Sequence, residues 1–462
     1  MVDDEILQRL IKKALSNGGE YADIFIEHRR SSAVQLEDDK IEKVISGTAA
    51  GIGIRLIYNG KTVFAFSNDF AEDMLIDLAG TVSKAASGSE KYGVIDMKKR
   101  PPETRFLIKI PPDTVAMSKK IDLIRSGNNA ARRFDNKIKQ VTVVYRDSLQ
   151  KVKVFTSEGY IAEDERIHTL GMAHVVAVDG EVIQTGYEPV GGLIGYELFD
   201  NNPLDVVALK AAQRAVMMLK AGRAPGGRMP VVISSEAGGT MIHEAIGHGL
   251  EADLAQQGLS VYSGKIGQQV ASPAITVIDD ATLPNKRGSF SFDDEGTPSG
   301  RNVLVKDGML MGYMYDKYTA LVDGVASTGN GRRESYEHKP VPRMTNTFIS
   351  PGTSSPEDVI KSVHRGLLVK KMGGGQVNTV TGDFVFDVQE GYLISNGGVS
   401  ELVRGATLIG SGPEVLKSID MVASDLGFSI GTCGKDGQGV PVSDAVPTLR
   451  IPEMTVGGEV NS

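Results

Sequence analysis

The chain is poor in cysteine, the residue whose disulfides cross-link many exported proteins. It has one cysteine among 462 residues, no tryptophan and 7 histidines. One cysteine excludes an intrachain disulfide, which is typical of a reducing compartment. No apolar run reaches the roughly 20 residues of a bilayer-spanning helix, and the first residues, Met-Val-Asp-Asp-Glu-Ile, do not resemble a signal peptide. These absences predict a cytoplasmic protein.

The chain also lacks an excess of positive charge. It carries 50 Lys and Arg against 58 Asp and Glu, for a net charge of -8. This balance argues against nucleic acid or an anionic membrane as a partner bound through bulk charge. The hydrophobic content of 41% and the charged content of 23% are ordinary for a globular protein. A chain of this length is expected to form two or more domains.

The spacing of apolar residues predicts an α/β (α+β) N-terminal half and a β-dominated C-terminal half. Helices are expected at residues 3–17, 71–87, 113–134 and 203–220, with short strands between them. Asn59-Gly60 is a strong hairpin signal. The Gly- and Pro-rich stretch Ala221–Pro230 predicts a boundary between a domain at residues 1–221 and a domain at residues 230–462.

The C-terminal half is expected to contain few helices after residue 258. One begins at Ser354-Ser-Pro-Glu357, which has the pattern of a helix N-terminus, and is expected to run to about Lys371. His364 would then lie in the middle of this helix, and residues 372–376, which are rich in glycine, would form a loop.

The stretch from Thr240 to Asp253 contains His243, Glu244 and His248. Two imidazoles and a neighbouring carboxylate can bind a metal and activate a water molecule. The histidines are five residues apart, so on a regular α-helix they would point about 140° away from each other. Both can reach one metal only if the helix carries an extra residue in one turn or ends there. Gly247 and Gly249 would permit either distortion.

A catalytic metal needs a third protein ligand. The remaining histidines, the carboxylates of Glu251 and Asp253, and Cys433 are the candidates. The other histidines are more simply interpreted as strand or surface residues: His28, His168, His174, His338 and His364. Cys433 lies among glycines and near Lys435, a setting that favours a thiolate. It can be a metal ligand, a reactive nucleophile or a buried, inert thiol.

Three polar segments of the C-terminal half are rich in arginine, acidic residues and amides: residues 289–298, 330–336 and 342–347. Each alone is interpreted as a solvated loop. Together, and in the same half as the metal motif, they can bind carboxylates and backbone amides of a substrate.

These residues together resemble the TldD/PmbA family, and its TldD branch in particular. The matching segments are Tyr21-Ala-Asp23, His243–Asp253, Asp293–Pro298, Arg343–Asn346 and Gly434–Gln438, spread in order over most of the chain. The resemblance implies a zinc metallopeptidase in which His243, His248 and Cys433 hold Zn²⁺. It also implies that Glu244 is the general base that activates water.

The resemblance further implies that unfolded or extended peptides are cut inside the cavity of a dimer. Residues 1–221 would then form the peptide channel and the dimer contact, and residues 230–462 would form the catalytic domain with the metal site. The partner would be a TldE/PmbA-type paralogue in a heterodimer, or a second copy in a homodimer. Two other interpretations stay open from the residues. One is a non-catalytic peptide-binding or regulatory subunit with a structural zinc. The other is a cysteine hydrolase that uses Cys433 with a histidine base.

Overall fold

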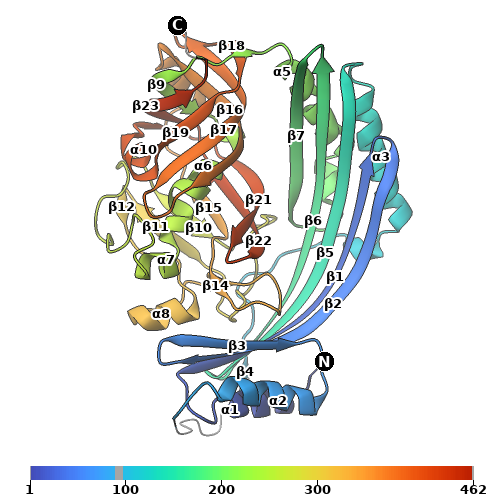
Figure 1. Ribbon diagram of the computed structural model, residues 1–462, viewed down its shortest axis with the longest axis vertical. Coiled ribbons are helices and arrows are strands. Elements are labelled where there is room, and N and C mark those ends of the chain that lie inside the picture. The colour runs from blue at the N-terminus through green and yellow to red at the C-terminus, as the bar shows by residue number, and fades with distance from the viewer. Residues whose placement is uncertain (1, 89–96, 460–462) are drawn as a thin grey trace.

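The computed structural model describes residues 2–88 and 97–459. Strands predominate in both halves, and the mixed α/β class is confirmed. A long curved sheet from the N-terminal half stands beside a C-terminal half that is built around two further sheets (Figure 1). The two halves face each other, and helices cover the outer side of the curved sheet (Figure 1).

The curved sheet has seven strands in the order β3-β2-β1-β5-β6-β4, and β7 also pairs with β6. They are β1 (Tyr21–Glu37), β2 (Lys40–Tyr58), β3 (Lys61–Ser67), β4 (Lys98–Lys99), β5 (Ile138–Thr156), β6 (Tyr160–Asp179) and β7 (Val182–Leu193). Several strands expected as short segments are therefore parts of long ones. Antiparallel pairing continues through their polar stretches, where Ser32 donates a hydrogen bond to Asp147 at 2.6 Å. The hairpin at Asn59-Gly60 is confirmed.

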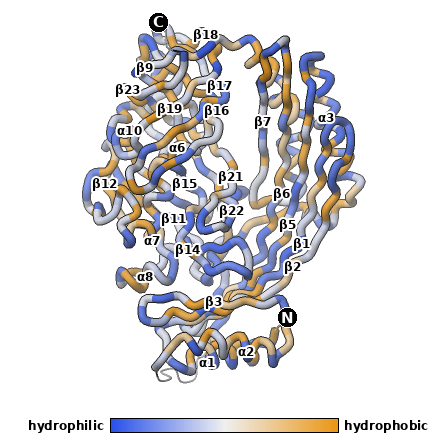
Figure 2. Tube along the Cα trace, viewed as in Figure 1, coloured by the Kyte–Doolittle hydropathy of each residue, from blue (hydrophilic) through white to orange (hydrophobic). Residues whose placement is uncertain are grey.

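Helices pack on two parts of this sheet. α3 (Met117–Arg132) and α5 (Leu204–Met218) cover the outer face, and α1 (Asp4–Ala14) and α2 (Glu72–Ser83) lie beside β3 at one end (Figure 1). Shorter turns are η1 (Pro112–Thr114) and α4 (Leu198–Asn201). Buried and half-buried positions alternate along β6 from residue 167 to residue 178, and α5 packs against this strand. Figure 2 shows hydrophobic residues along the strands of the curved sheet. The four expected N-terminal helices are thus present, with slightly shorter bounds.

The C-terminal half contains a six-stranded and an eight-stranded sheet. The first is formed by β10 (Val277–Asp280), β11 (Arg301–Lys306), β12 (Met309–Leu310), β15 (Asn346–Ile349), β21 (Gly427–Lys435) and β22 (Gln438–Val446). The second is formed by β8 (Gly222–Arg223), β9 (Gly227–Ile233), β16 (Arg365–Val377), β17 (Asp383–Ser395), β18 (Gly398–Arg404), β19 (Thr407–Ser411), β20 (Met421–Val422) and β23 (Leu449–Gly457). A separate pair is β13 (Gly331–Arg332) with β14 (Val341–Pro342).

The largest hydrophobic core of the described chain fills the space between these two sheets. Residues of both sheets contribute to it, together with Met241, Ile242 and Ile246 from the helical segment that carries the histidine motif. This segment is therefore held between two sheets. The other helices of this half are short: η2 (Ser235–Ala237), α7 (Ala252–Gln256), α8 (Lys317–Asp323), α9 (Pro356–Lys361) and α10 (Gly412–Ser418).

The helix expected from residue 354 to about Lys371 is wrong in its second half. α9 ends at Lys361, and residues 365–377 form β16 between β9 and β17. The run Leu367-Leu-Val369 is buried on both faces of the sheet, which suits a central strand and not an amphipathic helix. His364 lies between the two elements and not within a helix.

The glycines expected to form a loop after this helix also belong to β16. A Cβ at Gly375 would lie 1.9 Å from the ring of Phe386, so the ring of the neighbouring strand occupies the space of a side chain. Glycine is required there by packing, and not by a turn.

Buried charges join the two halves. Arg55 and Asp23 of the curved sheet are fully buried, and Arg55 lies 2.7 Å from Glu295 of the C-terminal half. Arg166 on β6 lies 2.6 Å from Asp294. Because these groups are removed from water on both sides, the halves are fixed relative to each other by paired charges as well as by apolar contacts.

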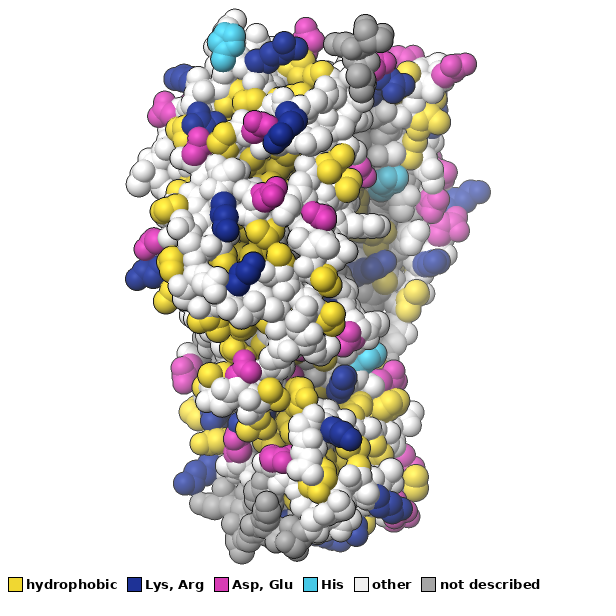
Figure 3. All heavy atoms as spheres, turned by 60° about the vertical axis from the view of Figure 1, so that its left-hand side comes forward, with side chains coloured by type: hydrophobic (Ala, Val, Ile, Leu, Met, Phe, Trp, Pro, Cys, Tyr) yellow, Lys and Arg dark blue, Asp and Glu magenta, His cyan; other side chains and the backbone are white. Residues whose placement is uncertain are grey.

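The surface mixes both signs of charge, as Figure 3 shows for one face, where basic and acidic side chains are interspersed. This agrees with the modest net charge of -8. In residues 2–88 and 97–459, no helix is long and apolar enough to cross a membrane.

Candidate metal centre

The histidine motif lies on a helix that changes its winding. α6 (Thr240–Ile242) runs into a π-helical turn, η3 (His243–Gly247), and then into a 3₁₀ turn, η4 (His248–Leu250). The backbone N–H of His248 donates to the carbonyl of His243, five residues earlier. The extra residue in this turn brings both imidazoles to the same side of the helix. The distortion predicted from the five-residue spacing is present.

Close packing around the π-helical turn leaves no room for a side chain at residue 247, and a hydroxyl satisfies one of its carbonyls. A Cβ at Gly247 would lie 2.1 Å from the sulfur of the buried Met344, so only glycine fits against that side chain. The Tyr262 hydroxyl donates to the Ala245 carbonyl at 3.0 Å and satisfies a backbone group within the wide turn. A Cβ at Gly239 would clash with the backbone of Asp444, so the start of the helix lies against β22.

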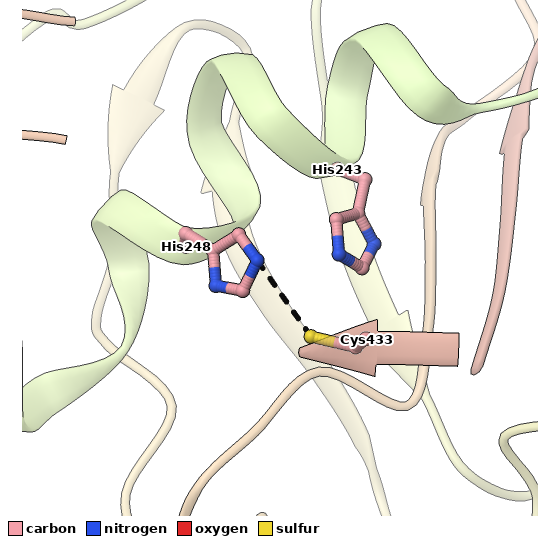
Figure 4. Close-up of side chains that lie close together, drawn as sticks. All are labelled: His243, His248 and Cys433. Carbon is pink, nitrogen blue, oxygen red and sulfur yellow. Dashed lines mark hydrogen bonds between the residues drawn. The ribbon is translucent and has the colours of Figure 1, made fainter. Parts of the chain in front are cut away.

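Cys433 reaches the histidines from the six-stranded sheet. It lies on β21, paired with Val440 of β22, and is 2% exposed. Its Sγ lies 3.6 Å from Nε2 of His248. The rings of His243 and His248 are 4.9 Å apart between centroids, at 86° to each other. Both imidazoles lie beside the sulfur (Figure 4).

Two carboxylates lie beside the Nδ1 atoms of the imidazoles. Glu251 Oε2 lies 3.0 Å from His248 Nδ1, and Asp444 Oδ2 lies 3.2 Å from His243 Nδ1. A carboxylate beside one ring nitrogen fixes the ring and leaves the other nitrogen for a ligand. Lys435 in turn pairs with Glu251 at 3.0 Å and with Asp253 at 2.7 Å.

These contacts set the protonation of the cluster. Burial alone would raise the pKa of the Cys433 thiol, but hydrogen bonds from His243 and His248 outweigh it and lower this pKa to about 5. Burial opposes the charge of His248, yet Glu251 and Cys433 raise the pKa of its imidazole to about 10. Burial would also raise the pKa of Glu251, but Lys435 and His248 lower it to about 2. The cluster is thus prepared to hold a thiolate.

His243, His248 and Cys433 can hold a metal ion, because their ligand atoms all lie within 4.8 Å of one another. With tetrahedral zinc bonds of about 2.3 Å to sulfur and 2.0–2.1 Å to nitrogen, the sulfur and a nitrogen would lie about 3.6 Å apart. The Cys433–His248 distance has this value. In residues 2–88 and 97–459, no fourth His, Cys, Asp or Glu joins the group. Three ligands with a position left open are typical of a catalytic site.

Glu244 lies beside the cluster in a pocket of about 340 Å³. The pocket is lined by His243, Glu244, Asp444, residues 429–432 of β21, Tyr187 and Pro189 of β7, and parts of β16 and β17. Burial raises the pKa of the Glu244 carboxyl, and the neighbouring His243 and His248 oppose that rise. A carboxylate of raised pKa that is open to a pocket suits proton transfer.

A larger pocket of about 710 Å³ continues from this one. The two share Pro189, Lys371, Ser429 and Ile430 in their linings. The larger pocket lies between β7 and α5 on one side and the C-terminal half on the other. A cleft between the halves therefore leads to Glu244 and to His243.

The other sequence candidates lie elsewhere. His28 stacks on Phe70, His168 contacts the Arg287 carbonyl and His338 contacts Ser335. His174 lies on β6 and His364 is exposed after α9. Glu251 and Asp253 contact His248 or Lys435 and are not part of the three-ligand group.

Asp444 was not among the candidates from the sequence. A signal was present, because it is the single charged residue in the apolar stretch Val440–Val446. A carboxylate inside a buried strand needs a partner.

Three family models match this chain, and together they span most of it. They are the PmbA/TldA metallopeptidase domain 1 over residues 22–89, the central domain over residues 110–219 and the C-terminal domain over residues 226–458. The C-terminal match contains all three metal-ligand candidates and Glu244.

Relatives with this chain organisation are found in bacteria and archaea. A metalloprotease TldD homolog of Haemophilus influenzae is 39% identical over 454 residues, which cover 95% of this chain and 93% of that protein. A metalloprotease of Methanocaldococcus jannaschii is 37% identical over 437 residues, which cover 94% and 96%. A zinc metalloprotease TldD homolog of Saccharolobus solfataricus is 28% identical over 459 residues, which cover 98% and 100%.

Two crystal structures share the fold. One, described as a candidate modulator of a DNA gyrase from Thermotoga maritima, has a TM-score of 0.80 and 22% identity, and the match covers 98% of this chain and 100% of that chain. The other, TldE from Thermococcus kodakarensis, has a TM-score of 0.78 and 20% identity, with the same coverage. At these identities the likeness concerns the fold alone.

Proposed function

This chain belongs to the PmbA/TldD family of metallopeptidases, and from that premise we propose that it is a zinc-dependent peptidase for unfolded or extended peptides. The observation that carries the proposal is the group of His243, His248 and Cys433, next to a pocket that is lined by His243 and Glu244. The printed name of the Saccharolobus solfataricus relative supports zinc as the metal.

The donor set suits zinc, because imidazole and thiolate are its common protein ligands. When bound, zinc acts as a Lewis acid and lowers the pKa of water in the site. The chain's own residues orient the metal ligands and transfer the proton. Asp444 and Glu251 keep the two imidazoles oriented. Glu244 accepts a proton from the attacking water and donates it to the leaving amine of the cleaved peptide bond.

An extended peptide fits the cleft between two edge strands. β7 is paired only with β6, and β21 ends the six-stranded sheet at β22, within the part of the chain that the structure describes. Residues of both strands line the pocket at Glu244. A peptide added along a free strand edge would be held by main-chain hydrogen bonds. Such binding requires an unfolded segment, which supports unfolded or extended peptides as the substrate class.

The substitution Glu244→Gln tests this function. It removes the proton acceptor and leaves His243, His248 and Cys433 in place. We expect about one zinc per chain in the wild type and in the variant, and a loss of peptide hydrolysis of at least about 100-fold in the variant. The measurements are metal analysis and cleavage of a denatured protein. Normal cleavage by Glu244→Gln would show that Glu244 is not the base.

A second candidate is a cysteine hydrolase, because the Cys433 thiol has a pKa of about 5 and lies 3.6 Å from His248. These are the properties of a cysteine nucleophile with a histidine partner. Iodoacetamide distinguishes the two functions. A zinc-loaded peptidase should keep its activity in the presence of this reagent, whereas a cysteine hydrolase should lose it and should work in the presence of a chelator.

A third candidate, a peptide-binding or regulatory subunit with a structural zinc, needs a fourth protein ligand or a site without catalysis. In residues 2–88 and 97–459 no fourth ligand joins the group, which supports the catalytic interpretation.

We propose that the chain acts in the cytoplasm as a dimer, with a TldE/PmbA-type paralogue or with a second copy. Mass measurement of the purified chain, alone and with a paralogue, distinguishes these assemblies.

A further inference from the structure

A third, smaller pocket of about 150 Å³ lies between the curved sheet and the C-terminal half and carries a concentration of positive charge. Five of its lining residues are arginines: Arg29, Arg166, Arg287, Arg332 and Arg333. The lining contains two carboxylates, Asp294 and Glu334. The pocket brings together side chains of the curved sheet and of the C-terminal half, including two arginines from the polar segment at residues 330–336.

Three of these arginines have acidic partners. Arg166 lies 2.6 Å from Asp294, Arg333 lies 3.4 Å from Asp23, and Arg29 lies 3.7 Å from Glu27. These pairs account for part of the positive charge.

The other two arginines bond to backbone carbonyls instead. Arg287 Nε donates to the Gly431 carbonyl at 3.1 Å, and Arg332 donates to the carbonyls of Met344 and Pro441. Within residues 2–88 and 97–459, neither guanidinium forms an ion pair with a carboxylate. Arg332 is 5% exposed. Arg332 is therefore held away from bulk water and Arg287 is half-buried, and neither guanidinium is directly paired with a carboxylate.

Such an arrangement is costly unless an anion completes it. Burial lowers the pKa of Arg332 to about 10 and also lowers the pKa of Arg287. The buried Nε of Arg333 has no hydrogen-bond partner. These donors have capacity for a further acceptor, and a guanidinium fork matches the two oxygens of a carboxylate.

The pocket directly adjoins the cleft that leads to Glu244. Pro441 lines the arginine pocket and is paired across the strands with Thr432, which lines the pocket at Glu244. Directly paired residues have Cβ atoms about 5 Å apart. Arg287 also connects the arginine pocket with the pocket at Glu244. It lines the first and donates a hydrogen bond to the carbonyl of Gly431, which lines the second.

We propose that the arginine pocket binds a carboxylate of the peptide substrate, supplied by an Asp or Glu side chain or by the C-terminus. This inference rests on the proposed peptidase function, because it names a feature of that enzyme's substrate. A peptide added at the free edge of β21 would lie two strand spacings, about 10 Å, from β22 and its Pro441, a distance that a long substrate side chain or a chain end can bridge. The pocket therefore selects substrates with negative charge at a fixed distance from the cleaved bond.

Matched peptides test the proposal. Alanine-rich decapeptides carry one Glu that is moved along the chain, and each has a twin with Gln in that place. A second pair has a free or an amidated C-terminus. Their affinity for zinc-loaded Glu244→Gln protein is measured by fluorescence anisotropy, and their hydrolysis is measured with the wild type. We expect one Glu position, or the free C-terminus, to strengthen binding by about tenfold or more, as for a charge-assisted hydrogen bond.

Arg287→Gln, combined with Glu244→Gln, should bring the ratio of the affinities for the Glu peptide and its Gln twin down to about one. The control is Arg301→Gln, since Arg301 lies on β11 with a side chain 54% exposed. It should keep the preference. Circular dichroism establishes that each variant is folded. If Arg287→Gln does not fold, the matched peptides with the unmodified pocket still decide the question.

The outcomes separate this proposal from the proposed function. Hydrolysis of Glu and Gln peptides at equal rates and equal affinities would overturn the carboxylate site and leave the peptidase intact. A carboxylate preference in binding without hydrolysis by the zinc-loaded wild type would overturn the peptidase and keep the site. Tight binding of inorganic phosphate without any peptide preference would identify the pocket as a site for a free anion and overturn the proposal.

Discussion

His248 and Glu251 form a buried pair in which Nδ1 of the imidazole lies 3.0 Å from Oε2 of the carboxylate. The pair is part of a chain of contacts, because Glu251 also lies 3.0 Å from Lys435. Nε2 of His248 consequently lies beside the Cys433 sulfur, at 3.6 Å. Glu251 thus determines which nitrogen is available to a metal.

Glu251→Gln should therefore weaken metal binding. The amide keeps the size of the side chain and removes the charge that orients the imidazole. We expect the zinc affinity to fall by about 10- to 100-fold, the usual effect of losing a hydrogen-bonding partner behind a metal ligand. Competition with a chromophoric chelator measures it. Asp253→Asn is the control, because Asp253 contacts Lys435 and not His248. Equal zinc affinity in Glu251→Gln and the wild type would contradict this role.

Gly247→Ala should disturb the π-helical turn that aligns the histidines. The new Cβ would lie 2.1 Å from the sulfur of Met344, which is fully buried. Overpacking of this kind costs about 1–3 kcal/mol of unfolding free energy. We expect a lower urea midpoint together with weaker zinc binding. Gly312→Ala is the matched control, because a Cβ at Gly312 meets no atom within 4 Å. Unchanged zinc affinity in Gly247→Ala would show that the alignment of the histidines does not depend on this contact.

Arg55→Met should destabilise the junction between the two halves. Arg55 is fully buried and pairs with Asp23 and Glu295, which would be left without their cation. Burial raises the pKa of Glu295 and Arg55 opposes that rise, so loss of Arg55 should raise this pKa further. Removal of one partner from a buried ion pair costs about 3–5 kcal/mol, measured by urea unfolding.

Arg9→Met is the control for this substitution. Arg9 pairs with Glu72 on the surface, with a side chain 58% exposed. Loss of such an exposed pair changes the unfolding free energy by less than about 1 kcal/mol. Equal effects of the two substitutions would mean that the buried network does not hold the halves together.

The sequence was sufficient for the part of the site that is local. The spacing of His243 and His248 required a distorted helix, and a π-helical turn is present between them. Cys433 lies on a distant strand, so its position relative to the histidines depends on how β21 packs against the helix. Spacing alone could not place it, and its assignment came from the family resemblance. Asp444 was missed because its contact with His243 forms only when β22 packs beside α6.

In the fold, as in the metal site, the predictions that hold depend on residues close together in the sequence. The helices near residues 4–14 and 204–218 were predicted because their apolar spacing and end signals lie within one segment. The sequence predicts helix and loop for residues 365–377, whereas their strand conformation depends on pairing with β9 and β17. Local preference is overridden where neighbouring strands supply the hydrogen bonds.

The half-buried imidazole of His168 should make folding sensitive to acid. Burial, together with the positive charge of Arg287, lowers the pKa of His168 from 6.5 to about 3. At pH 5 the imidazole is therefore neutral in the folded chain and protonated in the unfolded chain. Its contribution to stability is complete above pH 6.5 and is lost as the pH falls toward 3.

His168→Gln should remove this contribution. Between pH 7 and pH 5 the wild type should lose up to about 2 kcal/mol more unfolding free energy than the variant. Urea unfolding at the two pH values measures the difference, with His364→Gln as an exposed control. An equal loss in the wild type and His168→Gln would show that the imidazole is already protonated in the folded protein.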